Sequence, residues 1–112
     1  VFVGHETANV DNLPFPVEHH FKVGNNAWLH DYEIIQELKD YIRNSEKLRT
    51  VFLFACGPLS NYLITEIWKE NQDHFLLDIG SAFDLDLYSR PTRGFQSGKG
   101  GYGKFCEWDN RE

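Results

Sequence analysis

The stretch FLFACGPLSN, residues 52–61, joins a buried-type strand to the start of a helix through a single Gly-Pro pair. Gly57 permits a sharp turn, and Pro58 suits the first helical position, where no backbone N–H is needed. The backbone N–H groups of the first helical turn would then point over the strand end and attract a phosphate group, with the Ser60 hydroxyl as a further donor. Neither the P-loop spacing nor the GxGxxG fingerprint is present. The turn is therefore either a phosphate site without a basic residue or a plain strand-to-helix connection.

Charged side chains downstream of this turn have both a functional and a structural interpretation. Asp78 interrupts the apolar run FLLDIG, where a buried carboxylate needs a partner, so it either caps N–H groups of the next loop or binds a sugar hydroxyl or a metal-linked water. Asp84 and Asp86 have the DxD spacing that can hold a divalent metal against a diphosphate, but a solvated turn fits the same letters. Arg90 and Arg93 can grip a diphosphate with paired N–H groups or form surface ion pairs.

The histidines and one amide-rich segment complete the set of candidates. The five histidines show no regular metal spacing, and only His5, directly after an apolar run, is placed to reach a strand end. The segment GNNAW, residues 24–28, contributes two amides, including Asn26, and an indole. These groups suit a nucleobase or a sugar ring, although Trp28 can equally belong to the core.

The elements that must position these residues follow from hydrophobic patterning. Residues 50–55 and 74–80 form unbroken apolar runs, which are typical of strands buried on both faces of a parallel sheet. A helix is predicted from Asp31, with apolar residues at i, i+3, i+4 and i+7, and a second helix from Pro58. The resulting order predicts a three-layer, Rossmann-like α/β domain with a short, mostly parallel sheet and right-handed crossovers. The pattern dissolves from Ser81, so residues 81–105 are predicted to form a flexible flap within a long C-terminal loop.

All four predicted strands end at a glycine followed by a polar residue or a helix start. These glycines are Gly4, Gly24, Gly57 and Gly80. The carboxyl ends of parallel strands share one edge, and open α/β sheets bind ligands in the crevice outside that edge. Glycine would let a ligand approach the backbone there, although glycine also ends strands for purely structural reasons.

Composition and charge restrict the class of protein. The 112 residues fit a single domain, and a net charge of −6 without a basic stripe argues against a nucleic-acid partner. No apolar run approaches the roughly 20 residues of a membrane span, and no secretory signal is visible, so a cytoplasmic location is expected. Cys56 and Cys106 give no disulfide framework. The chain begins on Val1 within a strand-like run, which predicts a domain from a longer polypeptide.

The segment VFLFACGPLSNYLITEIWKENQDHFLLDIGSAFD, residues 51–84, resembles the carboxyl-terminal half of the GT-D type glycosyltransferases. That half carries a strand, a GP turn, a helix with an apolar face, a strand ending in DIG and a following Asp. The upstream order VFVG…VEHHFKVGNNAW is similar to the same family, so the resemblance covers most of residues 1–84. Longer chains of this kind also carry TRG and Cys-x-Trp after these motifs, here at residues 92–94 and 106–108.

The resemblance implies sugar transfer from a nucleoside-diphosphate sugar to a glycan acceptor. It also implies a divalent metal, Mn²⁺ or Mg²⁺, held by a D-x-E motif early in the family's domain. No D-x-E follows the first predicted strand of this chain, so the metal ligands are expected outside it, and the chain is interpreted as the downstream part of a longer glycosyltransferase. The resemblance assigns donor-pocket roles to Asn26, Gly57, Pro58, Asp78 and Gly80. The full predicted substrate-binding set adds three further residues: Ser60, Ser81 and Arg93.

Two other functional classes are compatible with parts of the sequence. A non-catalytic α/β module that binds a nucleotide or a partner protein would need the same strand-end glycines but no metal. A small hydrolase is disfavoured, because neither Ser60 nor Ser81 lies in a GxSxG elbow. An exposed sheet edge would allow self-association, so a homo-oligomer is a further hypothesis.

Overall fold

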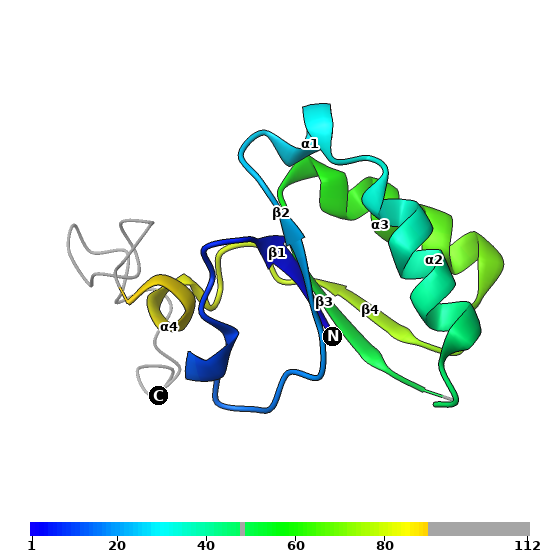
Figure 1. Ribbon diagram of the computed structural model, residues 1–112, viewed down its shortest axis with the longest axis horizontal. Coiled ribbons are helices and arrows are strands. Elements are labelled where there is room, and N and C mark those ends of the chain that lie inside the picture. Colours follow the sequence, from blue (N-terminus) through cyan, green and yellow to red (C-terminus); the bar gives the residue numbers. More distant parts are fainter. Residues whose placement is uncertain (48, 90–112) are drawn as a thin grey trace, which may run out of the picture.

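A four-stranded sheet forms the centre of the molecule. The structure is a computed structural model that describes residues 1–47 and 49–89. The strand order is β2-β1-β3-β4, and every neighbouring pair is parallel. The α/β class with a parallel sheet is therefore confirmed (Figure 1). The strands are β1 (Phe2–His5), β2 (His20–Val23), β3 (Val51–Ala55) and β4 (Phe75–Asp78).

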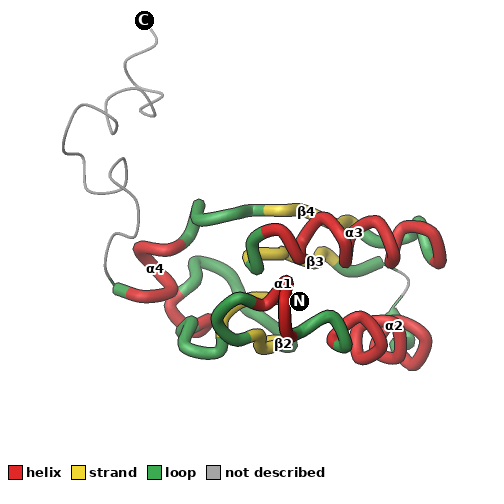
Figure 2. The backbone as a smooth tube through the Cα atoms, turned by 90° about the horizontal axis from the view of Figure 1, so that it is seen from above, coloured by secondary structure: helices red, strands yellow, loops and turns green. Residues whose placement is uncertain are grey.

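Helical segments cover the two faces of this sheet. The longer helices α2 (Ile34–Asn44) and α3 (Pro58–Glu70) lie on one face. The other face carries the 3-10 turn η1 (Val10–Asn12) and the short helix α4 (Asp84–Tyr88). Figure 2 shows the strands between these two layers, and a further short helix, α1 (Ala27–His30), lies above the carboxyl ends of the strands. No helix among the described residues is long and apolar enough to cross a bilayer.

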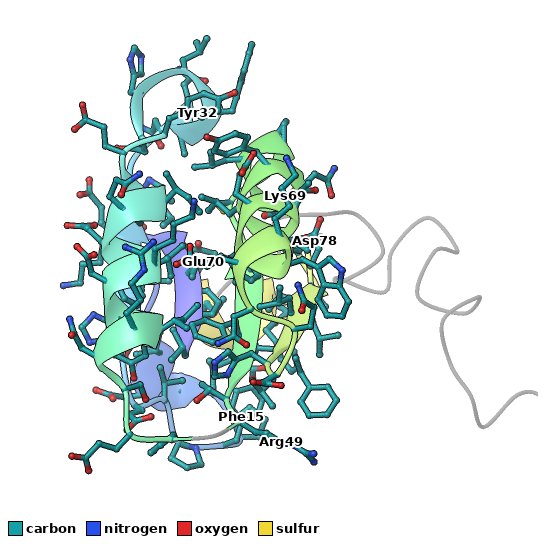
Figure 3. The ribbon with its side chains drawn as sticks, turned by 90° about the vertical axis from the view of Figure 1, so that its right-hand side faces the viewer. Phe15, Tyr32, Arg49, Lys69, Glu70 and Asp78 are labelled. Atoms are coloured by element: carbon teal, nitrogen blue, oxygen red, sulfur yellow. The ribbon has the colours of Figure 1, made fainter. Side chains whose placement is uncertain are left out.

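The main core lies between the sheet and the two long helices. Phe52 and Phe54 of β3 are fully buried there, and Leu63 of α3 packs against them. On α3 the buried apolar residues recur every fourth position, which is one face of a 3.6-residue helix. Glu70, the last residue of α3 (labelled in Figure 3), forms ion pairs with Lys39 and Arg43 of α2, so an ion-pair group connects the two helices.

The helix predicted from Asp31 begins three residues later, because Asp31 has another role. Its Oδ2 accepts a hydrogen bond from the Gly24 N–H at 3.1 Å, which ties the end of β2 to the residue after α1. Helix α1 was not predicted. It follows Asn26, which adopts the left-handed conformation with φ of 53°, and a single turn of four residues leaves no periodic pattern in the sequence.

The prediction that residues 74–80 form a strand buried on both faces was wrong. β4 is the last strand of the described sheet, and Phe75 and Leu77 are 57% and 50% exposed on the face opposite α3. Leu76 points to the other face and joins the core. Apolar letters alone do not distinguish a central strand from an edge strand, because burial depends on what the neighbouring layer covers.

The predicted loop from Ser81 also contains a helix. In α4, Leu87 is buried against Phe2 and Leu13, and its carbonyl oxygen accepts a hydrogen bond from the Asn9 N–H at 2.9 Å. Five residues with one buried side chain are too few to produce a readable helical period. The remainder of the predicted flap, with the TRG and Cys-x-Trp motifs, lies outside the described residues.

Gly4 lies inside β1 and has a packing role, whereas the sequence suggested that it ended the strand beside a ligand. A Cβ atom at this position would lie 2.4 Å from the Phe2 ring, so glycine makes room for that ring. The ring of His20 contacts Phe2 edge-to-face at 5.2 Å, and its Nε2 lies 3.3 Å from the Gly4 carbonyl oxygen. Phe2, Gly4 and His20 therefore form one packed unit across β1 and β2.

This environment makes stability depend on the protonation of His20. Burial lowers the pKa of His20 below its ordinary value of 6.5. As the pH falls through about 6.5, the unfolded chain binds a proton that the folded chain does not, so the free energy of unfolding should fall until the lower folded-state pKa is passed. Urea unfolding across about pH 7.5 to 5 measures this loss. The loss should be smaller in His20→Gln, and an equal slope in both proteins would contradict the assignment.

Candidate ligand site at the carboxyl edge of the sheet

The carboxyl ends of the four parallel strands lie along one edge of the sheet. The register pairs His5 with Val23 and Gly4 with Ala55, and the pairing of β3 with β4 ends at Asp78. Three of the predicted glycines follow these ends on that edge. They are Gly24, Gly57 and Gly80.

The chain connections diverge at one position on this edge. The connection from β1 to β2 passes over the face that carries η1, and the connection from β3 to β4 passes over the opposite face through α3. Connections that leave neighbouring strands in opposite directions open a crevice between them, and this is where open α/β sheets bind ligands. A hollow of about 360 Å³ lies here, within the range of small-molecule sites. Its lining comprises His5, Val23–Trp28 and Ala55–Pro58.

Gly57 provides the turn that opens this hollow. Its φ of 62° and ψ of −142° lie in a region that is essentially restricted to glycine, and Pro58 then occupies the first position of α3. Apart from Gly57 and its two chain neighbours, no described residue has an atom within 4 Å of the position that a Cβ would take on Gly57, so the space above the turn is open. The backbone around Gly57 thus faces an open region at the N-terminus of a 13-residue helix.

The Ser60 hydroxyl, predicted as a ligand donor, lies in the protein interior. Ser60 is fully buried, and its Oγ accepts a hydrogen bond from the Cys56 N–H at 3.1 Å and lies 3.2 Å from the Cys56 Sγ. Burial raises the pKa of the Cys56 thiol, and the contact with Ser60 opposes that shift. The pair therefore stabilises the strand-to-helix turn from the interior of the protein. Cys56 is a protonated thiol at neutral pH.

Ser60→Ala should destabilise the turn. The substitution leaves the buried Cys56 N–H without its acceptor, which costs about 1–3 kcal/mol in the free energy of unfolding. Asn61→Ala, one residue later and exposed, is the matched control and should change the stability by less than about 0.5 kcal/mol. Urea unfolding of both variants measures the difference. Equal stabilities would show that the bond between Ser60 and Cys56 does not support the turn.

A hydrogen-bond network fixes His5 at the mouth of the hollow. The Thr7 N–H donates to His5 Nδ1 at 3.1 Å, and the Thr7 hydroxyl lies 2.7 Å from the same nitrogen. The neutral ring therefore carries its proton on Nε2, which donates to Asn25 Oδ1 at 2.9 Å. His5 was a sequence candidate and Asn25 was one of the two amides noted in GNNAW, but the contact between them was not predicted. The alignment of β1 with β2 brings the two together, and only the general presence of GNNAW at a strand end hinted at it.

Asn26 and Trp28 also line the hollow, as members of the segment after β2. The left-handed backbone of Asn26 starts α1, and its side chain makes no capping hydrogen bond to that helix. The indole of Trp28 is 45% exposed, so it is not a core residue. Of the predicted site residues, Asn26, Gly57 and Pro58 are brought together here.

The predicted residues that follow β4 lie further along the edge and do not line the hollow. Asp78 Oδ1 accepts a hydrogen bond from the Gly80 N–H at 3.1 Å, so the capping interpretation of Asp78 holds in this structure. Gly80 is left-handed with φ of 52°, and the Ser81 carbonyl accepts a hydrogen bond from the Asp84 N–H. These contacts build the turn from β4 to α4. Arg93 lies outside the described residues.

The described residues offer no ligand set for the divalent metal that the resemblance implies. Within residues 1–47 and 49–89, no group of three His, Cys, Asp or Glu side chains could hold a metal ion. The described residues that line the hollow include no carboxylate. Hard divalent cations prefer carboxylate and other oxygen ligands, so no catalytic step is assigned to a metal held by these residues.

A second and larger hollow, of about 700 Å³, lies at the amino edge of the sheet. Figure 3 shows Phe15 and Arg49 of its lining at the opposite end of the molecule from Tyr32. Its walls are mainly apolar, and the charges of Glu18 and Lys47 already satisfy each other at 2.7 Å. It lacks the glycine turn and the helix N-terminus of the carboxyl edge, so the smaller hollow is the better candidate for a polar ligand.

Comparisons of the chain with protein-family models, with curated proteins and with solved structures gave no match. The resemblance to GT-D type glycosyltransferases therefore stays a prediction that depends on the motifs of residues 51–84. The geometry of the carboxyl edge is the basis on which a ligand can be assigned to this chain.

Proposed function

We propose that this chain binds a nucleoside-diphosphate sugar at the carboxyl edge of its sheet and serves as the donor-binding part of a glycosyltransferase that acts on a glycan. The observation that carries this proposal is the hollow between the diverging connections of β1 and β3, opened by the glycine-only turn at Gly57. The diphosphate would lie against the N-terminus of α3, where oriented amides and the partial positive charge of the helix favour an anion.

Neutral polar groups around the hollow suit the nucleoside part of such a ligand. The amides of Asn25 and Asn26 can bond base edges or ribose hydroxyls. His5 is held by Thr7 and Asn25, so its position is fixed before any ligand arrives. A preorganised polar group costs little entropy on binding.

Sugar transfer itself is supported only by the resemblance. In that reaction the bond between the anomeric carbon and the diphosphate breaks, a bond to an acceptor oxygen forms, and the acceptor hydroxyl loses its proton. The role assigned to this chain is to bind and orient the donor. The metal and the group that takes the proton are expected from residues outside the described part.

The alternative proposal is a non-catalytic nucleotide-binding module. One observation favours it, because among the described residues no Asp or Glu side chain lines the hollow, where a general base would have to stand. Such a module would bind a nucleoside diphosphate without metal and would support no turnover within a longer protein.

Calorimetric titration with UDP-, GDP- and ADP-sugars, each with and without Mn²⁺, tests the proposal. We expect at least one donor to bind with a low-millimolar or tighter Kd, and Gly57→Val to weaken that binding at least about tenfold, since it closes the space at the helix N-terminus. Val51→Thr, on the exposed amino end of β3, should bind as the original chain does. Absence of binding by every donor would contradict the proposal. Metal-independent binding together with no turnover in a longer protein would favour the alternative.

A further inference from the structure

We propose that three exposed aromatic side chains beside the hollow, Trp28, Tyr32 and Tyr62, form a binding surface for the pyranose rings of the glycan acceptor. We call these three residues the rim aromatics. The inference rests on the proposed function, because it assigns the second substrate of the same site.

The rim aromatics come from α1, from the segment that follows it and from the start of α3. Trp28 lines the hollow, and α1 packs against α3. Tyr32 and Tyr62 contact each other edge-to-face, with ring centroids 4.9 Å apart. Figure 3 places Tyr32 at the same end of the molecule as α1, beside the beginning of α3. The surface therefore continues outward from the proposed donor pocket.

The rings of the rim aromatics are exposed and do not belong to the hydrophobic core. Trp28, Tyr32 and Tyr62 are 45%, 42% and 39% exposed, whereas Ala27 supplies the buried side chain of α1. A group of large apolar side chains held at the surface commonly marks a binding site. The edge-to-face contact gives the two tyrosine rings a defined relative orientation in the absence of a ligand.

The chemistry of this surface fits a sugar better than an apolar peptide or an anion. A pyranose ring presents a face of C–H groups, which packs against an aromatic ring, and a rim of hydroxyl groups, which needs hydrogen-bond partners. The two tyrosines supply phenol hydroxyls, and the amides of Asn25 and Asn26 lie at the edge of the hollow. None of the rim aromatics is a basic residue, so this surface offers no cation of its own to an anionic partner.

The position of the rim aromatics beside the donor pocket also supports their assignment as the acceptor surface. An acceptor hydroxyl must come within bonding distance of the donor's anomeric carbon, so an acceptor surface has to border the donor pocket. Trp28 belongs to both surfaces, because it lines the hollow and its ring remains half exposed. The exposed Trp68, near the C-terminal end of α3, lies far along the helix from Pro58 and provides an internal comparison.

The test is an NMR titration of the whole 112-residue chain with neutral pentasaccharides: chitopentaose, cellopentaose, maltopentaose and mannopentaose. The indole N–H signals of Trp28 and Trp68 are followed without any nucleotide, so the result does not depend on donor binding. We expect the Trp28 signal to shift with at least one sugar at millimolar concentration while the Trp68 signal stays unchanged. Trp28→Ala and Tyr62→Ala should each weaken that binding about tenfold, and Trp28→Phe should retain most of it.

Trp68→Ala is the matched control and should bind the sugar as the original chain does. The proposal is overturned if no sugar shifts the Trp28 signal, or if the Trp68→Ala loss equals the Trp28→Ala loss. It is also overturned if the Trp28 signal broadens with protein concentration alone, since a second copy would then cover this surface. Donor binding in the calorimetric experiment without any sugar binding here would reject the acceptor surface and leave the proposed donor site standing.

Discussion

Gly57→Ala is expected to destabilise the protein by about 1–3 kcal/mol and to weaken donor binding at the carboxyl edge. The cause is the backbone, since φ of 62° with ψ of −142° is a conformation that a residue with a Cβ atom rarely adopts. A steric clash is not the cause, because no described atom outside residue 57 and its two chain neighbours would lie within 4 Å of the new Cβ atom. The turn should relax toward ordinary dihedrals, which would move Pro58 and reorient the first amides of α3.

Two other glycines provide graded controls for stability. Gly80 also has a positive φ, of 52°, so Gly80→Ala should cost about 1 kcal/mol. Gly24 has no positive φ, and a Cβ there would meet its nearest atom, Asp31 Oδ2, at 3.9 Å, so Gly24→Ala should be nearly neutral. In urea unfolding, the loss of stability on substitution by alanine should be largest at Gly57, smaller at Gly80 and smallest at Gly24. A neutral Gly57→Ala would show that the turn does not require glycine.

Phe52→Ala should produce the largest loss of stability, about 3–5 kcal/mol. Phe52 is fully buried at the centre of the core, where its ring contacts His74 edge-to-face at 5.5 Å and stacks near Phe54 at 6.4 Å. Removal of the ring loses its transfer free energy and leaves a cavity between the sheet and the helices. Because a small domain is stable by about 5–15 kcal/mol, the variant can lose most of its folded population at physiological temperature.

The neighbouring position gives the control for that experiment. Val51 precedes Phe52 on β3 but is 47% exposed, so Val51→Thr should change the free energy of unfolding by less than about 0.5 kcal/mol. Equal losses at the two positions, measured by urea unfolding, would mean that the core does not lie on the helix-bearing face of the sheet.

The parts of the fold that the sequence predicted are those with strong local signals. β2 ends directly before Gly24, as predicted, and α3 begins at the predicted proline, because glycine and proline mark these ends through their own backbone restrictions. The parallel sheet followed from the order of the elements. The short helices α1 and α4 were missed, because one turn of helix shows no hydrophobic periodicity. The exposed face of β4 was also missed, because burial of a strand depends on which elements pack over it, and the local sequence does not determine that packing.

The candidate site was predictable only in part, and for the same reason. Gly57, Pro58 and Asn26 lie directly after strands, so the sequence placed them at the carboxyl edge. The inward direction of Ser60 depends on the rotation of α3 about its axis, and the contact of His5 with Asn25 depends on the register of β1 with β2. Distances between residues far apart in the chain are set by packing, which a single sequence does not state.

The most direct measurement of ligand binding at the carboxyl edge is a backbone-amide NMR map of the chain, titrated with the nucleoside-diphosphate sugar that binds most tightly in calorimetry. Binding there predicts shifts grouped at His5, Asn25 and Gly57, around the hollow where the connections of β1 and β3 diverge. Shifts grouped instead at Phe15 and Val51, around the amino-edge hollow, would contradict the proposed donor site.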